Sequence, residues 1–429
     1  MNASSLLQSY QHFGVHLGLE RIHQLLQKLD NPHKQVPIIH VAGTNGKGSV
    51  CAYLSSVLTE AGYRVGRYTS PHLIDWTERI CINQKPISPT ALQQCLERVV
   101  AATQNNTETP TQFEIITAAA WLYFAEQKTD IAVIETGLGG RLDATNVCET
   151  PLASVITSIS LEHWQILGPT VADIAGEKAG ILKAKCPAVI GELPESARIV
   201  VEKRIQELDC PATWVKPARD LGQGFAEYHP HPEISVNPRS SAVKIKYQLP
   251  LLGKIQLMNS AIAIATLQTL QNQGWQISQT AIENGIAKTQ WPGRLQQTTW
   301  KNRKILIDGA HNPAAAIALR EYVDRLNDRP SAINWVIGIL ATKDCDDILK
   351  ALLKKGDRLY LVPVPDPKSS SPAELAALAQ IICPELTLCQ AFRDLTTALD
   401  AAVTGDNLTI LCGSLYLVGY FLQQQQSQA

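Results

Sequence analysis

A glycine-rich run near the start of the chain carries the clearest chemistry in the sequence. Residues 43–49 read Gly-Thr-Asn-Gly-Lys-Gly-Ser, between the apolar segment 37–41 and a helical pattern over 48–61. Glycines at such a turn let backbone N–H groups close around phosphate oxygens, while the lysine would neutralise phosphate charge and the serine could contact Mg²⁺. The alternative is a plain glycine-rich turn with a solvated lysine. The predicted ATP-binding residues are Gly43, Thr44, Asn45, Gly46, Lys47, Gly48 and Ser49.

Two further candidate residues follow predicted strands later in the chain. Glu135 ends the apolar segment 131–135, and His163 comes shortly after the segment 154–159. Ligands of open α/β sheets bind at the carboxyl ends of the strands, and a carboxylate there suits a hard cation beside a triphosphate. We therefore predict Glu135 as a Mg²⁺ ligand. A lone histidine after a strand is more often a packing residue, so His163 depends on reaching the same edge of the sheet.

A mostly parallel sheet would position these residues. From residue 36 onward, short β-rich segments alternate with helical patterns, which favours an α/β fold. The region 221–252 differs, because it contains several prolines and alternates apolar with polar residues over 242–247, which predicts a small antiparallel insertion. Strands of the sheet are predicted at 37–41, 63–68, 131–135, 154–159 and 188–190.

A second alternating series predicts another α/β domain. Between the two series, Trp-Pro-Gly-Arg at 291–294 interrupts both helix and strand, which indicates a hinge. The predicted fold class is thus α/β with two domains. Residues 1–293 would form a P-loop ATPase-like sheet with the antiparallel insertion, and residues 294–429 a Rossmann-like domain. Strands of the second domain are predicted at 305–307, 335–339, 359–364 and 408–412.

Length and composition exclude several classes of protein. The 429 residues favour two domains, and 38 basic against 39 acidic residues leave no global field for nucleic acid or an anionic membrane. The ten cysteines include no Cys-x-x-Cys pair, and the first ten residues lack the pattern of a signal peptide. We therefore expect a cytoplasmic protein with reduced thiols, without nucleic-acid or membrane partners. The glutamine-rich residues 423–429 are expected to be a frayed end.

The motifs occur in an order that resembles the dihydrofolate synthase/folylpolyglutamate synthase family of the Mur ligase superfamily. The phosphate run has the short G-T-N-G-K form of that superfamily, rather than the common G-x-x-x-x-G-K-[ST] form. The resemblance covers nearly the whole chain. The further motifs are Thr-Ser-Pro-His at 69–72, Glu-Thr-Gly at 135–137, Glu-Lys-Ala-Gly at 177–180, Trp-Pro-Gly-Arg at 291–294 and Asp-Gly-Ala-His-Asn-Pro at 308–313.

The resemblance implies a metal site. Mg²⁺ would be held by Ser70, Glu135 and His163, with Ser49 and Lys178 close to the metal; K⁺ is a further possible cation. Lys178 is at the position that is carbamylated in relatives, which requires a neutral amine and hence a lowered pKa. The alternatives are a turn role for Ser70 and a helix-surface lysine paired with Glu177 or solvent.

The resemblance also implies where the nucleotide and the substrates bind. Asn259, Arg294 and Asp308 would contact ATP, with His311 close by as a catalytic candidate beside Lys47 and Lys178. Ser414 is a candidate for the glutamate pocket. Phe113 could stack on the ring of a pterin, and Asp143 could accept hydrogen bonds from the ring N–H groups. The alternatives are that Phe113 is a plain core residue and that Asp143 is a helix cap. The residues implied for the pterin are Gly14, Val15, His16, Leu17, Thr111, Gln112, Phe113, Glu114, Leu142, Asp143 and Ala144.

The implied activity is ATP-dependent ligation of L-glutamate to dihydropteroate, to reduced folates, or to both. The acid would attack the γ-phosphate of ATP to give an acyl phosphate, which the amine of glutamate then displaces; domain closure at 291–294 would exclude water. We expect a monomer. Two alternatives stay open: a Mur-type ligase acting on a cell-wall precursor, and an ATP-binding protein without ligase chemistry.

Overall fold

The computed structural model divides into two compact units. One consists of Met1–Pro250 with Gln256–Gln290, and the other of Leu251–Ile255 with Trp291–Ala429. The domain boundary predicted from the sequence is at residue 293. The roles predicted for the two domains stay predictions. None of the described helices is long and apolar enough to cross a membrane. The residues described are 3–10, 16–104, 108–230, 244–326 and 332–428.

The central sheet of the first unit is mostly parallel. In its described part the strand order is β4-β3-β2-β5-β1-β6-β7-β8, with β3 antiparallel to β2 and β4 antiparallel to β3. Strands β1, β5, β6 and β7 are buried over their whole length, which is consistent with their nearly continuous apolar sequences. The strands are β1 (Ile38–Ala42), β2 (Val65–Tyr68), β3 (Ile80–Ile82), β4 (Lys85–Pro86), β5 (Ile131–Glu135), β6 (Ala153–Ile156), β7 (Ala188–Ile190) and β8 (Ala212–Trp214).

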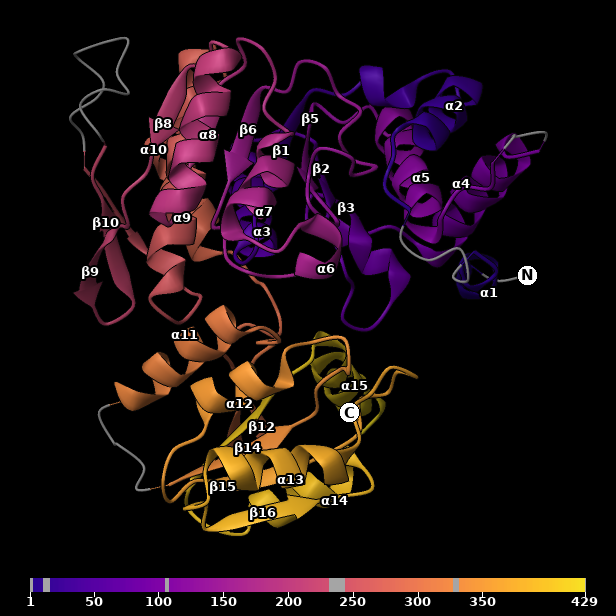
Figure 1. The fold of residues 1–429 in the computed structure, drawn as a ribbon. Coiled ribbons are helices and arrows are strands. Elements are labelled where there is room, and N and C mark those ends of the chain that lie inside the picture. The colour runs from indigo at the N-terminus through magenta and orange to yellow at the C-terminus, as the bar shows by residue number, and fades with distance from the viewer. Residues whose placement is uncertain (1–2, 11–15, 105–107, 231–243, 327–331, 429) are drawn as a thin grey trace. The chain divides into compact units, whose positions relative to one another are not determined.

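Helices cover this sheet, as Figure 1 shows. Helix α3 follows β1 directly and is buried almost all round, because it packs on the sheet and against α10. Helix α5 is likewise apolar on all sides and belongs to the main core of the unit. The helices are α1 (Ala3–Gln8), α2 (Glu20–Lys28), α3 (Lys47–Glu60), α4 (Pro89–Ala102), α5 (Gln112–Glu126), α6 (Trp164–Leu167), α7 (Val171–Ala179), α8 (Glu195–Glu207), α9 (Ile255–Asn272) and α10 (Gln279–Ala287).

The predicted antiparallel insertion is confirmed. Strands β9 (Arg219–Gly222), β10 (Phe225–Tyr228) and β11 (Ile245–Gln248) form a sheet of order β11-β10-β9 with antiparallel pairing throughout. The buried hydroxyl of Tyr247 lies 2.8 Å from Ser260 Oγ in α9, so the insertion packs on that helix. Part of the proline-containing segment lies outside the described residues.

The second unit is also an α/β domain, as predicted. Its strand order is β12-β13-β17-β14-β15-β16, parallel except for β12 against β13. Strands β12 and β16 are edge strands that the apolar pattern did not predict, because β12 is largely polar and β16 has only four residues, none of them fully buried. The elements are β12 (Gln296–Trp300), β13 (Arg303–Ile307), α11 (Pro313–Asp324), β14 (Ile333–Ile337), α12 (Cys345–Leu352), β15 (Arg358–Leu361), α13 (Pro372–Ile382), β16 (Leu388–Ala391), α14 (Leu395–Ala402), β17 (Leu408–Cys412) and α15 (Leu415–Gln428).

The glutamine-rich end of the chain corrects one expectation. It is not a frayed tail, since α15 continues to Gln428. Gln425 accepts a hydrogen bond from the hydroxyl of Thr298 and donates to the backbone carbonyl of Thr299 in β12. Glutamine is a good helix former, so a helix that begins on apolar residues can extend through it.

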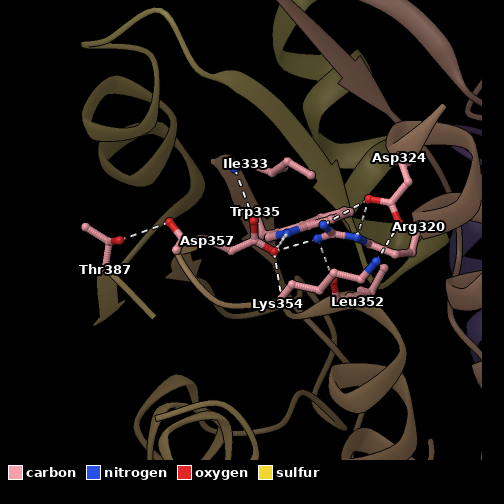
Figure 2. A network of polar contacts seen from close by, with 9 residues as sticks. Arg320, Asp324, Ile333, Trp335, Leu352, Lys354, Asp357 and Thr387 are labelled. Carbon is pink, nitrogen blue, oxygen red and sulfur yellow. Dashed lines mark hydrogen bonds and ion pairs between the residues drawn. The ribbon is translucent and has the colours of Figure 1, made fainter. Parts of the chain in front are cut away.

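A buried polar network in the second unit centres on Asp357, as Figure 2 shows. Its carboxylate accepts from Arg320 Nη1 at 2.6 Å, from Trp335 Nε1 at 3.0 Å, and from the backbone N–H groups of Ile333 and Lys354. The side chains of Arg320 and Asp357 are only 11% and 3% exposed. The network joins α11, β14 and the turn before β15.

Replacing Asp357 should therefore destabilise the second unit strongly. We expect Asp357→Ala to lower the free energy of unfolding by about 3 kcal/mol or more, because the buried indole N–H of Trp335 and two backbone N–H groups lose their acceptor. Arg320 also loses one of its carboxylate partners and keeps Asp324 and the carbonyl of Leu352. Urea unfolding measures the change. Asp346→Ala is the matched control, since it removes a carboxylate from an exposed pair with Lys350 on α12 and should cost under about 0.5 kcal/mol. Equal losses in the two variants would contradict the expectation.

Candidate functional site

The glycine-rich run forms the turn between β1 and α3. Strand β1 lies between β5 and β6, with Val41 opposite Glu135 in the register. Helix α3 begins at Lys47, and Gly46 before it has a left-handed backbone with φ of 89°. The run thus meets the start of a helix at the carboxyl edge of the sheet, where N–H groups and the helix dipole favour an anion.

The segment after β6 supports this loop. The backbone N–H of Thr44 donates to the carbonyl of Ser158 at 2.7 Å, and that of Asn45 donates to Ser158 Oγ at 3.1 Å. The hydroxyl of Thr157 donates to the carbonyl of Asn45 at 2.7 Å. Two loop N–H groups are therefore bound within the protein, so we expect phosphate to meet the groups from Gly46 onward. Sequence reasoning missed Thr157 and Ser158, because it placed both inside the strand predicted at 154–159, whereas β6 ends at Ile156 and the two residues belong to the segment after it.

Two lysines converge on the first glycine of the loop. Lys47 Nζ donates to the carbonyl oxygen of Gly43 at 2.9 Å and to that of Thr44 at 3.2 Å. Lys178 Nζ, from α7, donates to the same Gly43 oxygen at 2.8 Å and is buried. Burial, with a smaller contribution from Lys47, lowers the pKa of Lys178 to about 7. Lys178 is therefore no surface lysine; Glu177 forms its ion pair with Arg141 instead.

The structure brings Ser70 and Glu135 together. Strand β2 neighbours β5, and the backbone N–H of Ser70 donates to Glu135 Oε2 at 3.2 Å. Glu135 is buried at the end of β5. Both Glu135 and Lys47 act electrostatically on the buried Cys51 thiol, whose pKa is raised mainly by burial. His163 precedes α6 with a left-handed backbone, and its half-exposed ring lies 3.9 Å from Glu162.

A polar stretch of α9 lies against the loop and α3. Asn259 Nδ2 donates to Gln256 Oε1 at 3.2 Å, and Gln256 Nε2 lies 3.4 Å from Ser49 Oγ. A Cβ added to Gly46 would stand 2.4 Å from Asn259 Oδ1, so the helix approaches the loop as closely as glycine allows. Gln256 is a residue next to the loop that sequence reasoning missed, and its burial beside Ser49 becomes visible only in the structure.

Four of the residues implied for the pterin, 111–114, lie at the start of α5. Thr111 and Glu114 form a capping box, in which each side chain binds the backbone N–H of the other. Glu114 also accepts from Arg21 Nε at 3.1 Å. Gln112 Nε2 donates to the carbonyl of Leu7, so it connects α5 to α1. His16 and Leu17 lie just before α2, whereas Gly14 and Val15 lie outside the described residues.

Phe113 and Asp143 both contact the segment after β5. The ring of Phe113 lies so close to Gly137 that a Cβ there would stand 2.4 Å from it. Asp143 is buried and accepts from the backbone N–H of Leu138 at 2.7 Å and from both N–H and Oγ1 of Thr145. Asp143 therefore shapes this segment; binding of a pterin by Phe113, Leu142, Asp143 and Ala144 stays a prediction.

The second unit brings its own candidate residues to one sheet edge. Asp308 follows β13, and its two oxygens accept from the backbone N–H groups of Leu295 and Ala310, each at 2.8 Å. Burial raises the pKa of Asp308, while Arg294 opposes that shift. His311 Nδ1 lies 2.7 Å from the carbonyl of Gly309. Ser414 follows the neighbouring strand β17, and its hydroxyl accepts from the backbone N–H of Tyr416.

Fold and loop together define a class. A glycine-rich turn at the carboxyl edge of a parallel sheet, with lysines beside the start of a helix, is typical of phosphate-loop nucleotide-binding proteins. Comparison with known families narrows the class: residues 41–267 match the Mur ligase middle domain, and residues 292–424 match the C-terminal domain of dihydrofolate synthetase.

Curated relatives make the identification. The chain is 36% identical to a probable dihydrofolate synthetase of Schizosaccharomyces pombe, over 94% of this chain and 97% of that protein. It is 34% identical to the dihydrofolate synthase/folylpolyglutamate synthase of Bacillus subtilis, over 97% of both chains. The chain belongs to the dihydrofolate synthase/folylpolyglutamate synthase family.

Solved structures of folylpolyglutamate synthases are also similar to this chain. The folylpolyglutamate synthase of Mycobacterium tuberculosis, complexed with ADP and AMPPCP, is similar with a TM-score of 0.85 and 29% identity over 99% of both chains. E. coli FolC in complex with DHPP and ADP is similar with a TM-score of 0.83 and 29% identity, over 100% of this chain and 98% of that one.

The close approach of Asn259 to Gly46 can be tested with a pair of glycines. Gly46 and Gly62 have nearly equal left-handed φ values, 89° and 93°, but a Cβ at Gly62 would meet nothing within 4 Å. Gly62→Ala should cost only the backbone strain of about 1–2 kcal/mol. Gly46→Ala should also displace Asn259 and the loop, and weaken MgATP binding at least about tenfold.

Calorimetric titration of MgATP and thermal unfolding measure the two effects. We expect Gly62→Ala to lower the melting temperature without changing the affinity for MgATP. If Gly46→Ala binds MgATP as tightly as Gly62→Ala does, the loop does not hold the nucleotide in the way described.

Proposed function

We propose that the chain is an ATP-dependent ligase that joins L-glutamate to dihydropteroate, to reduced folates, or to both. Family membership supports the assignment, as do similar structures that hold ADP and DHPP. The observation that carries it is the convergence of Lys47 and Lys178 on the Gly43 carbonyl, at the sheet edge that also holds Glu135. A triphosphate and an acid would be activated at this edge.

The reaction would proceed in two steps. An oxygen of the acid's carboxylate attacks the γ-phosphorus of ATP, the bond to the β-phosphate oxygen breaks, and an acyl phosphate and ADP result. The neutral amine of glutamate then attacks the acyl carbon, the bond from that carbon to the phosphate oxygen breaks and phosphate leaves, and the nitrogen loses one proton to give the amide. Lys47 would balance charge on the phosphates, since phosphoryl transfer depends on positioning and electrostatic stabilisation rather than on a protein nucleophile.

The residues present fit a magnesium ion. Among the described residues, no cluster of three or more His, Cys, Asp or Glu side chains could hold a metal. Mg²⁺ typically takes one or two protein oxygens and completes its shell with phosphates and water. Glu135 and the hydroxyls of Ser49 and Ser70 are oxygen donors of that kind, and His163 is the further candidate. The ion would neutralise charge on the β and γ phosphates.

Lys178 is suited to carbamylation. Its lowered pKa gives a substantial neutral fraction near neutral pH, and only the neutral amine reacts with carbon dioxide. The product is an anion, which would relieve the repulsion between Lys178 and Lys47. We propose this modification for the working enzyme. K⁺, the monomeric state and the cytoplasmic location stay predictions.

The other site residues have assigned parts in the proposal. Asn259 would contact the nucleotide beside the phosphate loop, and Arg294 and Asp308 would contact it from the second unit. His311 and Ser414 would contact the glutamate or the acyl phosphate. Their positions at the edge of the second sheet support these roles.

The ligase activity is tested by ADP release with labelled glutamate, run separately with dihydropteroate and with tetrahydrofolate. We expect release that depends on glutamate and on at least one acceptor, and a labelled product. Lys47→Ala should reduce the rate at least about 100-fold, because it removes a charge that stabilises the transition state. Lys288→Ala, an exposed lysine paired with Glu60, is the control.

The two alternatives give different results in the same assay. Turnover with a cell-wall precursor and another amino acid, but with neither folate acceptor, would identify a Mur-type ligase. Nucleotide binding without glutamate-dependent ADP release would identify a non-catalytic ATP-binding protein.

The lowered pKa of Lys178 predicts a specific dependence of stability on pH. The pKa is about 7 in the folded state and 10.5 when unperturbed, so between these values the unfolded chain binds a proton that the folded chain does not. The free energy of unfolding therefore rises with pH between about pH 7 and pH 10.5. Below about pH 7 the folded chain bears the full cost of burying the charged amine of Lys178. Relative to Lys178→Met, the wild-type protein should gain about 1 kcal/mol per pH unit above about pH 7.

Urea unfolding in buffer free of carbon dioxide measures this difference without interference from carbamylation. Lys288→Met should run parallel to the wild-type protein across the same pH range, because Lys288 is exposed. If the free energy of unfolding of Lys178→Met also changes with pH in the same way as that of the wild-type protein, the pKa of the Lys178 amine is not lowered in the folded state.

A further inference from the structure

The guanidinium of Arg21 connects the segment just before α2 with the region around the start of α5, which is about 90 residues away in the sequence. Its Nη2 donates to the carbonyl of His16 at 2.7 Å, its Nε to Glu114 Oε2 at 3.1 Å, and its Nη1 to Glu108 Oε2 at 3.2 Å. The Arg21 side chain is only 12% exposed. A guanidinium presents its donors in a rigid planar fork, so this one side chain fixes the relative positions of its acceptors.

Glu114 is oriented by this contact. Its Oε2 accepts both from Arg21 and from the backbone N–H of Thr111, the latter at 2.7 Å, and its side chain is 2% exposed. Its other oxygen, Oε1, is buried and has no hydrogen-bond partner among the residues that the structure describes. Since buried carboxylate oxygens normally accept hydrogen bonds, we expect Oε1 to accept from an N–H of a ligand.

Arg21 also holds the segment before α2. It binds the carbonyl of His16, and two residues later Gly18 N–H donates to the carbonyl of Leu142 at 3.5 Å. Leu142 precedes Asp143 in the segment after β5. Arg21 thus joins residues 16–18 to the first turn of α5, two segments implied in binding the acid substrate.

We propose that Arg21 is a positioning residue for the acid substrate: it sets the Glu114 carboxylate and the backbone of residues 16–18 in the geometry that binds the ring system. The inference rests on the proposed function, because it takes a folate-type acid as the acceptor. Arg21 acts on binding of the acid rather than of ATP, since its contacts are with His16, Glu108 and Glu114 and not with the phosphate loop.

Steady-state kinetics of the full chain test the role, with dihydropteroate or tetrahydrofolate varied in one series and ATP in another. Arg21→Met keeps an apolar stem but has no donor, whereas Arg21→Lys keeps the charge and can reach only part of the acceptor set. We expect Arg21→Met to raise KM for the acid at least about tenfold, with KM for ATP changed less than about twofold. Arg21→Lys should restore part of the loss.

Arg98→Met is the matched control. Arg98 pairs with Glu126 at an exposed site that joins α4 to α5 in the same unit. Its loss should change neither KM. A double variant, Arg21→Met with Glu114→Gln, should raise KM for the acid by less than the product of the two single effects, because Arg21 acts through Glu114.

The outcomes separate this inference from the proposed function. Wild-type turnover of a folate acceptor, with an unchanged KM for the acid in Arg21→Met, would refute the role of Arg21 alone. Equal increases of both KM values would also refute it, since they would indicate a general structural role. Absence of turnover by the wild-type protein with either acceptor would refute the proposed function and this inference with it.

Discussion

Two lysine ammonium groups donate to the same backbone carbonyl, that of Gly43, and this shared contact governs the electrostatics of the site. One of the two lysines is buried, so both desolvation and repulsion disfavour its proton. An anion near the loop would reduce the repulsion between the two lysines; the triphosphate of ATP and the carbamate proposed for Lys178 are both anions of this kind. The loop is thus arranged for negative charge before any ligand binds, which is the condition for electrostatic preorganisation.

The order of strands explains why residues so far apart in the sequence share one edge. Strands β2, β5, β1 and β6 are consecutive neighbours and mutually parallel, so their carboxyl ends lie side by side. Ser70 follows β2, Glu135 ends β5, the phosphate loop follows β1 and Ser158 follows β6. Each element brings one kind of group: a hydroxyl, a carboxylate, a set of glycine N–H groups, and a backbone support for the loop.

In each of the two units, candidate carboxylates are held by backbone N–H groups of the same unit. Asp143 and Asp308 each accept from backbone donors on both oxygens, and Glu114 completes a capping box. These bonds stabilise the turns in which the residues lie and orient any remaining acceptor capacity. The structural role of these side chains is therefore compatible with the binding role proposed for them, and the contacts of Arg21 with Glu114 support the positioning role proposed for a residue outside the motifs.

The sequence by itself determined the α/β class, the phosphate loop, the antiparallel insertion and most buried strands, because glycine placement and apolar periodicity are local signals. It did not determine the edge strands β12 and β16, the helical end of the chain, or supporting residues such as Gln256, Ser158 and Arg21. Whether Lys178 is on the surface or buried against Gly43 was decided only by the tertiary structure. A polar side chain has a partner only once distant strands and helices pack together, and no local pattern specifies that partner.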